Sequence, residues 1–104
     1  MPDRFEFLKQ QLEKNPDHAF SRYGLAMEFV SRGDLASALL HFQTLIEKHP
    51  DHTAAYYHAG QTLVKLGRKA DAIAMWRSGV AACDRKGDWH TKEELLSAIG
   101  AASS

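Results

Sequence analysis

The sequence predicts an all-α fold in which antiparallel helix pairs stack side by side. Apolar residues recur at helical spacing along the chain, and a 34-residue period relates two long stretches of it. Glycine and proline mark the ends of helices at matching places in both stretches. No segment alternates between apolar and polar residues, so we expect no strand.

The period is most visible at the turns. Asn15-Pro16-Asp17-His18 returns as His49-Pro50-Asp51-His52, and Gly33 returns as Gly67. The same offset relates Tyr23 to Tyr57, Val30 to Val64, Ala36 to Ala70 and Ala38 to Ala72. It also aligns three sets of apolar residues, namely Phe5, Leu39 and Ile73, then Leu8, Phe42 and Trp76, then Leu12, Ile46 and Val80. Three helices therefore share one buried frame.

We predict helices at residues 3–15, 18–32, 35–48, 52–66, 69–84 and 90–99. Asp3 with Glu6 and Thr91 with Glu94 match the capping-box pattern of a helix start, and Asp34 and Asp51 can each cap the helix that follows. His18 and His52 hold equivalent places, which suggests that they also serve at helix starts.

The predicted stops follow from backbone chemistry. Gly33 and Gly67 suit the left-handed residue that ends a helix, while Pro16 and Pro50 prevent the preceding helix from continuing. Gly100 and the Ala-Ala-Ser-Ser tail are expected to fray.

A 34-residue helix–turn–helix unit resembles the tetratricopeptide repeat, whose pattern runs W-x2-L-G-x2-Y, then A-x3-F, then P. Ala38-x3-Phe42 leads to Pro50, and Ala72-x3-Trp76 supplies the same pair in the next unit. The first helices match more loosely, with Leu25-Ala26-x2-Phe29 and Ala59-Gly60-x2-Leu63. The chain departs from the pattern where Arg22 and Tyr56 replace the tryptophan, where Asp84 replaces the closing proline and where Gly79 takes a helix position.

The resemblance implies a right-handed superhelical stack, a tetratricopeptide-like α-solenoid, within a single domain over residues 1–104. We expect full repeats at about 19–52 and 53–86. Because two repeats alone leave apolar faces open, helix 3–15 should act as a half-repeat, and helix 90–99 should cap the other end through Leu95, Leu96 and Ile99. Small residues should allow close helix contact at Ala26, Gly60, Ala38 and Ala72, with Phe29, Phe42, Leu63 and Trp76 filling the core.

Bulk composition excludes several classes of function. Thirteen basic residues balance 13 acidic ones, so no basic surface points to nucleic acid or to an anionic membrane. The amino terminus lacks the pattern of an export signal, and no apolar run is long enough to span a bilayer. Cys83 is the single cysteine, which cannot form an intramolecular disulfide. We therefore expect a cytoplasmic protein without a cofactor.

No motif predicts an enzyme or a metal site. His49 and His52 form the tightest histidine cluster, but Pro50 breaks the helix that would place both rings on one face. Neither Cys83 nor any serine shows the arrangement of a nucleophile with its base, so Cys83 is interpreted as a packing residue. The acidic pairs Asp84/Asp88 and Glu93/Glu94 are interpreted as solvated helix ends.

The resemblance implies a concave groove lined by the first helix of each repeat. It places in that groove eight candidate partner-binding residues: Tyr23, Met27, Val30, Tyr57, His58, Gln61, Val64 and Lys65. One branch of the family holds chaperone tails through lysines, asparagines and an arginine. Here Tyr23, Met27 and His58 stand where three of these residues belong, and only Lys92 is a basic remnant, so chaperone-tail binding is not expected.

We therefore predict a protein-interaction module, a scaffold or adaptor, that binds a peptide or a helix of another protein in the groove. One alternative is a self-assembling structural protein that pairs through Leu95, Leu96 and Ile99 or through the face of helix 3–15, which allows a weak homo-oligomer. A histidine-based metal binder is the less favoured alternative.

Overall fold

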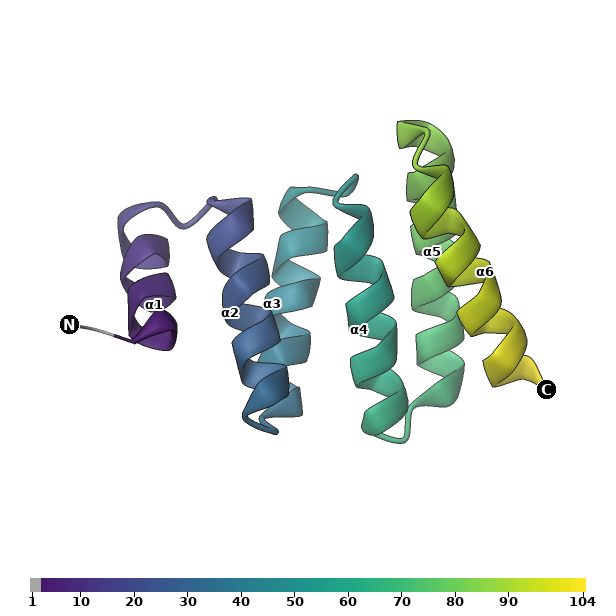
Figure 1. Cartoon of the computed structure of the whole chain (residues 1–104), viewed down its shortest axis with the longest axis horizontal. Coiled ribbons are helices and arrows are strands. Elements are labelled where there is room, and N and C mark those ends of the chain that lie inside the picture. The colour runs from purple at the N-terminus through teal and green to yellow at the C-terminus, as the bar shows by residue number, and fades with distance from the viewer. Residues whose placement is uncertain (1–2) are drawn as a thin grey trace.

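Six α-helices follow one another along the long axis of the molecule in the computed structural model (Figure 1). The structure describes residues 3–104, so the first two residues of the predicted domain lie outside it. The helices are α1 (Arg4–Lys14), α2 (Ala19–Ser31), α3 (Leu35–Lys48), α4 (Thr53–Lys65), α5 (Lys69–Lys86) and α6 (Trp89–Ser103). The prediction of an all-α helical-repeat stack is confirmed. Figure 1 shows α2 in front of α3 and α6 in front of α5.

Side chains cap three helices as the sequence predicts. The Asp3 carboxylate accepts a hydrogen bond from the backbone N–H of Glu6 at 2.9 Å, and Asp34 accepts one from Ser37 at 3.2 Å. His18 begins α2, where its Nδ1 accepts the backbone N–H of Ser21 at 3.2 Å. Each bond satisfies an N–H group that the helix itself leaves without a partner.

Two predicted caps are wrong. Asp88, not Thr91, caps α6, and it accepts the backbone N–H of Thr91 at 3.1 Å. The Asp88 carboxylate also accepts the Thr53 hydroxyl at 2.6 Å, and these hydrogen bonds lower its pKa to about 2. At the start of α4 the cap position belongs to His52, because the Asp51 carboxylate is drawn into an ion pair with Arg85 at 3.0 Å.

Glycine ends three helices in the left-handed conformation. Gly33 and Gly67 both have a φ of 78°, as expected, and Gly87 repeats this geometry at 77°. Helix α5 therefore extends beyond the predicted residue 84 to Lys86, because Asp84, unlike proline, does not interrupt a helix. Helix α6 continues to Ser103 and does not fray after residue 99, since Gly100 stays helical and Ala102 packs against the core.

The shared frame of the second helices is buried or half-buried at every position. Phe42 is fully enclosed beside Ala26, Ala38 and Leu45, and Leu63, Ala72 and Trp76 form a second cluster with Cys83 and Leu95. Phe29, also predicted to be core, is half-buried. Burial raises the pKa of the Cys83 thiol, which is consistent with a packing residue.

Trp76 lies directly against Gly60. A Cβ atom at residue 60 would sit only 2.0 Å from the indole Nε1 of Trp76, so no larger residue fits without displacing the ring. The same Nε1 donates a hydrogen bond to the Tyr57 carbonyl at 3.1 Å. Helices α4 and α5 are therefore held by a close contact that depends on glycine.

The flanking helices pack through short apolar stripes. Leu8 and Leu12 of α1 contact Leu25 of α2, and Leu95 of α6 fits beside Gly79 of α5. Ile99 is half-buried against the second cluster. Leu96 does not join this packing, contrary to our expectation, because Leu95 and Ile99, one turn apart, form the packed side of α6 and leave Leu96 49% exposed.

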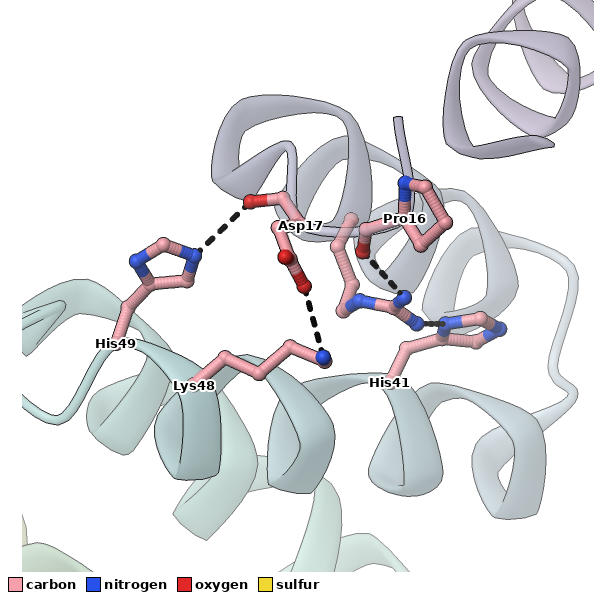
Figure 2. Close-up of polar contacts among 6 residues, drawn as sticks. Pro16, Asp17, His41, Lys48 and His49 are labelled. Carbon is pink, nitrogen blue, oxygen red and sulfur yellow. Dashed lines mark hydrogen bonds and ion pairs between the residues drawn. The ribbon is translucent and has the colours of Figure 1, made fainter. Parts of the chain in front are cut away.

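Polar contacts fasten the turn between α1 and α2 to α3 (Figure 2). Lys48 donates to the Asp17 carboxylate at 2.7 Å, and the His49 ring donates to the Asp17 carbonyl at 3.0 Å. Arg22 donates to the Pro16 carbonyl at 2.8 Å. Arg22, which stands where the tetratricopeptide pattern has tryptophan, thus holds the backbone of this turn.

The next turn is fastened in the same way. Tyr56, which is equivalent to Arg22, donates its hydroxyl to the Pro50 carbonyl at 2.6 Å. Arg85 binds the Asp51 carboxylate at 3.0 Å and also donates to the Pro50 carbonyl at 3.2 Å. The proline–aspartate turn thus supplies a carbonyl and a carboxylate to its neighbours in both repeats.

Three histidines lie between helices with their rings against aromatic residues. His41 stacks on Phe29 with ring centroids 5.4 Å apart, and His58 stacks on Phe42 at 6.3 Å. His52 lies against Tyr23 at 5.2 Å, and its Nδ1 is buried without a hydrogen-bond partner. Only His18, of the two predicted helix-start histidines, makes a side-chain cap.

Burial lowers the pKa of all three interface histidines, and nearby cations lower it further. Arg22 acts in this way on His41, Lys86 on His52 and Lys65 on His58. A backbone hydrogen bond opposes the shift at His52, and Glu94 opposes it at His58. Folding therefore disfavours the protonated form of these three rings relative to the unfolded chain.

We predict that Trp76→Ala lowers the free energy of unfolding by about 3–5 kcal/mol, because it removes a large buried ring and leaves a cavity. Denaturant titration followed by circular dichroism measures the change. Trp89→Ala is the matched control, since Trp89 is 61% exposed and its loss should change stability by no more than about 0.5 kcal/mol. Equal effects of the two changes would contradict the burial of Trp76.

We also predict that stability falls as the pH drops below about 6.5, the ordinary histidine pKa, because the unfolded chain then binds protons that the folded state does not accept. Thermal melts between pH 7.5 and 5 should show the loss. His58→Phe keeps a ring against Phe42 and should flatten this dependence, whereas His90→Gln should not, because the His90 side chain is exposed. An unchanged slope in His58→Phe would contradict the assignment.

Candidate functional site

The eight candidate binding residues lie on α2 and α4, the first helices of the two repeats. Tyr23, Met27 and Val30 are spaced along α2, while Tyr57, His58, Gln61, Val64 and Lys65 occupy α4. Both helices begin at a proline-containing turn and end at a left-handed glycine, so the repeat itself fixes the register between the two sets.

Three of these residues form a continuous row of rings, which we call the aromatic strip: Tyr23, His58 and Tyr57. The Tyr23 and His58 ring centroids are 5.8 Å apart with an interplanar angle of 63°, and those of His58 and Tyr57 are 5.2 Å apart at 85°. Edge-to-face contacts of this kind are favourable between aromatic rings. The 34-residue offset aligned the tyrosines, and His58 is the ring that joins them.

The aromatic strip rests on the core. His58 stacks over the fully buried Phe42, and Tyr23 also contacts the Phe42 ring at 6.3 Å. All three rings of the strip are half-buried, and burial raises the pKa of Tyr23. The strip therefore has an inner side that stabilises the fold and an outer side that remains accessible.

A hollow of about 230 Å³ adjoins α4. Gln61, Val64 and Lys65 line it together with Trp76 of α5. Val64 is 44% exposed, so the hollow presents an apolar wall to solvent, and Lys65 adds a positive charge. A side-chain amide anchors the region, because Gln61 donates to the Tyr57 hydroxyl at 2.8 Å.

Sequence reasoning missed the contribution of Trp76 to this hollow. The frame of the second helices identified Trp76 as core, and the side chain is buried in agreement with that prediction, because only 4% of its surface is exposed. Gly60 was the signal in the sequence that could have predicted this contribution. A glycine on α4 lets the Trp76 ring pack directly on the helix backbone, which brings the ring close to the α4 residues that line the hollow.

Met27 and Val30 differ from the residues on α4. Both are half-buried and pack against the first core cluster, which contains Ala26 and Phe42. They border the aromatic strip along α2 but offer a smaller exposed fraction than Val64 does.

Two other hollows have their charged groups largely engaged. One of about 320 Å³ lies beside Arg22 and His41, which bond to each other at 3.1 Å. The other, of about 540 Å³, lies at the turns, where Asp17 holds both Lys48 and His49. These groups serve to fasten the turns.

Metal and membrane sites have no counterpart in the described chain. The helices of residues 3–104 include none with the length and hydropathy of a bilayer span. Over the same range, no three histidine, cysteine or acidic side chains gather as a metal site would require. Lys92, which the sequence offered as a basic remnant of a chaperone clamp, is bound to Asp84 at 2.7 Å and lies over the Trp89 ring.

Comparison with known proteins agrees with this architecture. Residues 23–85 match the family model described as tetratricopeptide repeat. A tetratricopeptide repeat domain protein from Salinibacter ruber, solved by NMR, is 33% identical with a TM-score of 0.80 over 85% of this chain and 89% of that chain. A protein from Bordetella parapertussis is 26% identical with a TM-score of 0.84 over 99% and 90% of the two chains.

More distant structures share the fold. The TPR2B domain of yeast Sti1, solved as a pHsp70 complex, has a TM-score of 0.88 at 15% identity and covers 95% of this chain and 79% of that chain. Among curated proteins, no significant relative matches the sequence. The family model spans more than half of this chain, and the similarity to the Salinibacter ruber domain extends over most of both chains. The chain belongs to the tetratricopeptide repeat family.

Proposed function

We propose that this domain is a protein-interaction module, a scaffold or adaptor, that binds a peptide or a helix of another protein across α2 and α4. The observation that carries the proposal is the aromatic strip, in which Tyr23, His58 and Tyr57 join the first helices of two repeats. Stacked repeats present extended surfaces of this kind, and the family generally mediates contacts between proteins.

The chemistry of the strip suits a protein ligand. Tyrosine offers a large contact area at low entropic cost, and its hydroxyl remains hydrated in the free protein. The Gln61 bond orients the Tyr57 hydroxyl before a partner arrives, which reduces the entropy lost on binding. Met27 and Val30 supply adaptable apolar surface next to the strip.

The hollow beside α4 supplies an anchor point. Its volume of about 230 Å³ and its Val64 wall accept one apolar side chain of a partner. Lys65 makes no ion pair within the described residues and is available to a carboxylate beside that side chain. The proposed ligand therefore combines an apolar anchor with a nearby acidic group.

Binding of chaperone tails is not included in the proposal. The yeast Sti1 domains of the same fold were solved as pHsp70 and pHSP90 complexes, but their identity to this chain is 15%. Here the positions of the clamp carry Tyr23, Met27 and His58, and Lys92 is engaged by Asp84. The proposal includes no catalytic activity, and Cys83, the single cysteine, is fully enclosed.

Selection of peptides from a displayed random library against the immobilised domain tests the proposal. We predict that Tyr23→Ala/Tyr57→Ala weakens a selected peptide by about 1–2 kcal/mol or more, the loss typical of anchor residues. Isothermal titration measures the affinity. Because Tyr23 also packs on Phe42, thermal melts must show that the variant remains folded at the assay temperature.

A second variant separates binding from folding. Val64→Ser/Lys65→Ala changes exposed side chains and should weaken the same peptide while leaving the melting temperature nearly unchanged. Leu40→Ser on α3 is the matched control, since Leu40 is 65% exposed and lies outside the proposed site. If the peptide binds the parent, both double variants and Leu40→Ser with equal affinity, the binding surface lies elsewhere.

A further inference from the structure

Large apolar side chains are exposed at both ends of the helix row. Phe7 of α1 is 51% exposed, while Trp89 and Leu96 of α6 are 61% and 49% exposed. Trp89, Lys92 and Leu96 follow one another at helical spacing and share one side of α6. These faces are separate from the aromatic strip, so a role for them is independent of the proposed function.

The repeat period shows what Phe7 would contact in a complete repeat. Phe7 is equivalent to His41 and Met75 by the 34-residue offset. His41 of α3 stacks on Phe29 of α2, the first helix of its own repeat, at 5.4 Å. Helix α1 has the place of a second helix, and within residues 3–104 no first helix covers Phe7. Phe7 therefore faces the position that such a helix would take.

The caps define the register of α6. His18 and His52 begin the first helices of the two repeats 34 residues apart, and Asp88 begins α6 after a further 36, because α5 is longer. By this offset Leu96 is equivalent to Gly60, the residue that lies against Trp76 of the following second helix. Leu96 thus faces the position of a second helix, and among the described residues none is there.

Within residues 3–104, each end of the helix row therefore leaves uncovered the face that would pack against the kind of helix found at the other end. We propose that two copies of this chain associate end to end, with α6 of one copy packed against α1 of the next as the first and second helices of a composite repeat. Such a contact continues the α2–α3 and α4–α5 pairing across the junction and buries Phe7, Trp89 and Leu96. It joins unlike surfaces, so it can add further copies.

The composite repeat packs less closely than the repeats within the chain. Leu96 stands where Ala26 and Gly60 allow close approach, and Arg4 stands where Ala38 and Ala72 do so. Arg4 leans towards α2 and pairs with Glu28 at 3.2 Å, which keeps its charge at the edge of the contact. The association is accordingly weak and depends on concentration.

Sedimentation equilibrium of the 104-residue chain from micromolar to millimolar concentration tests the proposal. The average mass should rise above the monomer value of 11.6 kDa. Phe7→Glu and Leu96→Glu should each raise the dissociation constant at least about tenfold, because each places a charge in an apolar contact. Leu40→Glu, an exposed position on α3, should have no effect. Circular dichroism melts of all variants should match the parent.

Mixing the two variants distinguishes the arrangement. Phe7→Glu retains an intact α6 face, and Leu96→Glu retains an intact α1 face. At a concentration where the parent associates, each variant alone should therefore be mainly monomeric, while an equimolar mixture should form a dimer and nothing larger. A parent that remains monomeric at every concentration would overturn the proposal. Association of Phe7→Glu or of Leu96→Glu by itself with the dissociation constant of the parent would also overturn it, since it would indicate contact between like ends.

Discussion

The fold depends on the close approach of α4 and α5 at Gly60. The Trp76 ring occupies the space that any side chain at residue 60 would need, and its Nε1 bonds to the backbone of the same helix. This contact brings Trp76 under the hollow that Val64 and Lys65 border. Gly79 has a similar role in the next helix, where Tyr56 and Leu95 crowd its backbone. Small residues thus set the helix spacing, and the spacing determines which large residues reach the binding face.

The turns impose a second constraint, which acts through polar groups. In each proline–aspartate turn, the proline carbonyl accepts a hydrogen bond from a residue of the following first helix. The aspartate carboxylate accepts one from a lysine or arginine on a second helix. The chemistry of the donor varies, because Arg22 and Tyr56 make equivalent bonds with different groups. The repeat therefore keeps a geometry that several side chains can satisfy, which explains how it tolerates departures from the family pattern.

The 34-residue period and the glycine and proline residues at the helix ends predicted the helix order, the left-handed glycines at residues 33 and 67 and the second-helix frame. These features follow from local backbone preference and from spacing. Three features escaped prediction because they depend on contacts distant in sequence. Asp51 was expected to cap α4, but Arg85 competes for its carboxylate. Leu96 was expected to be a capping contact, but the caps of α4 and α6 lie 36 residues apart instead of 34, and in the resulting register Leu96 stays 49% exposed. The ring of His58 between the tyrosines depends on its stacking over Phe42, which spacing alone does not specify.

Helix α1 illustrates a general property of such a row, in which each helix touches mainly its neighbours. Helix α1 is held chiefly by the packing of Leu8 and Leu12 against α2, and Arg4 of α1 adds an ion pair with Glu28 of α2. In a nearest-neighbour system the free energy of opening grows with the number of junctions that must break, so the row opens from its extremities inward. Amide protons of α1 should exchange with solvent earlier than those of α4, whose two flanking junctions with α3 and α5 both protect it.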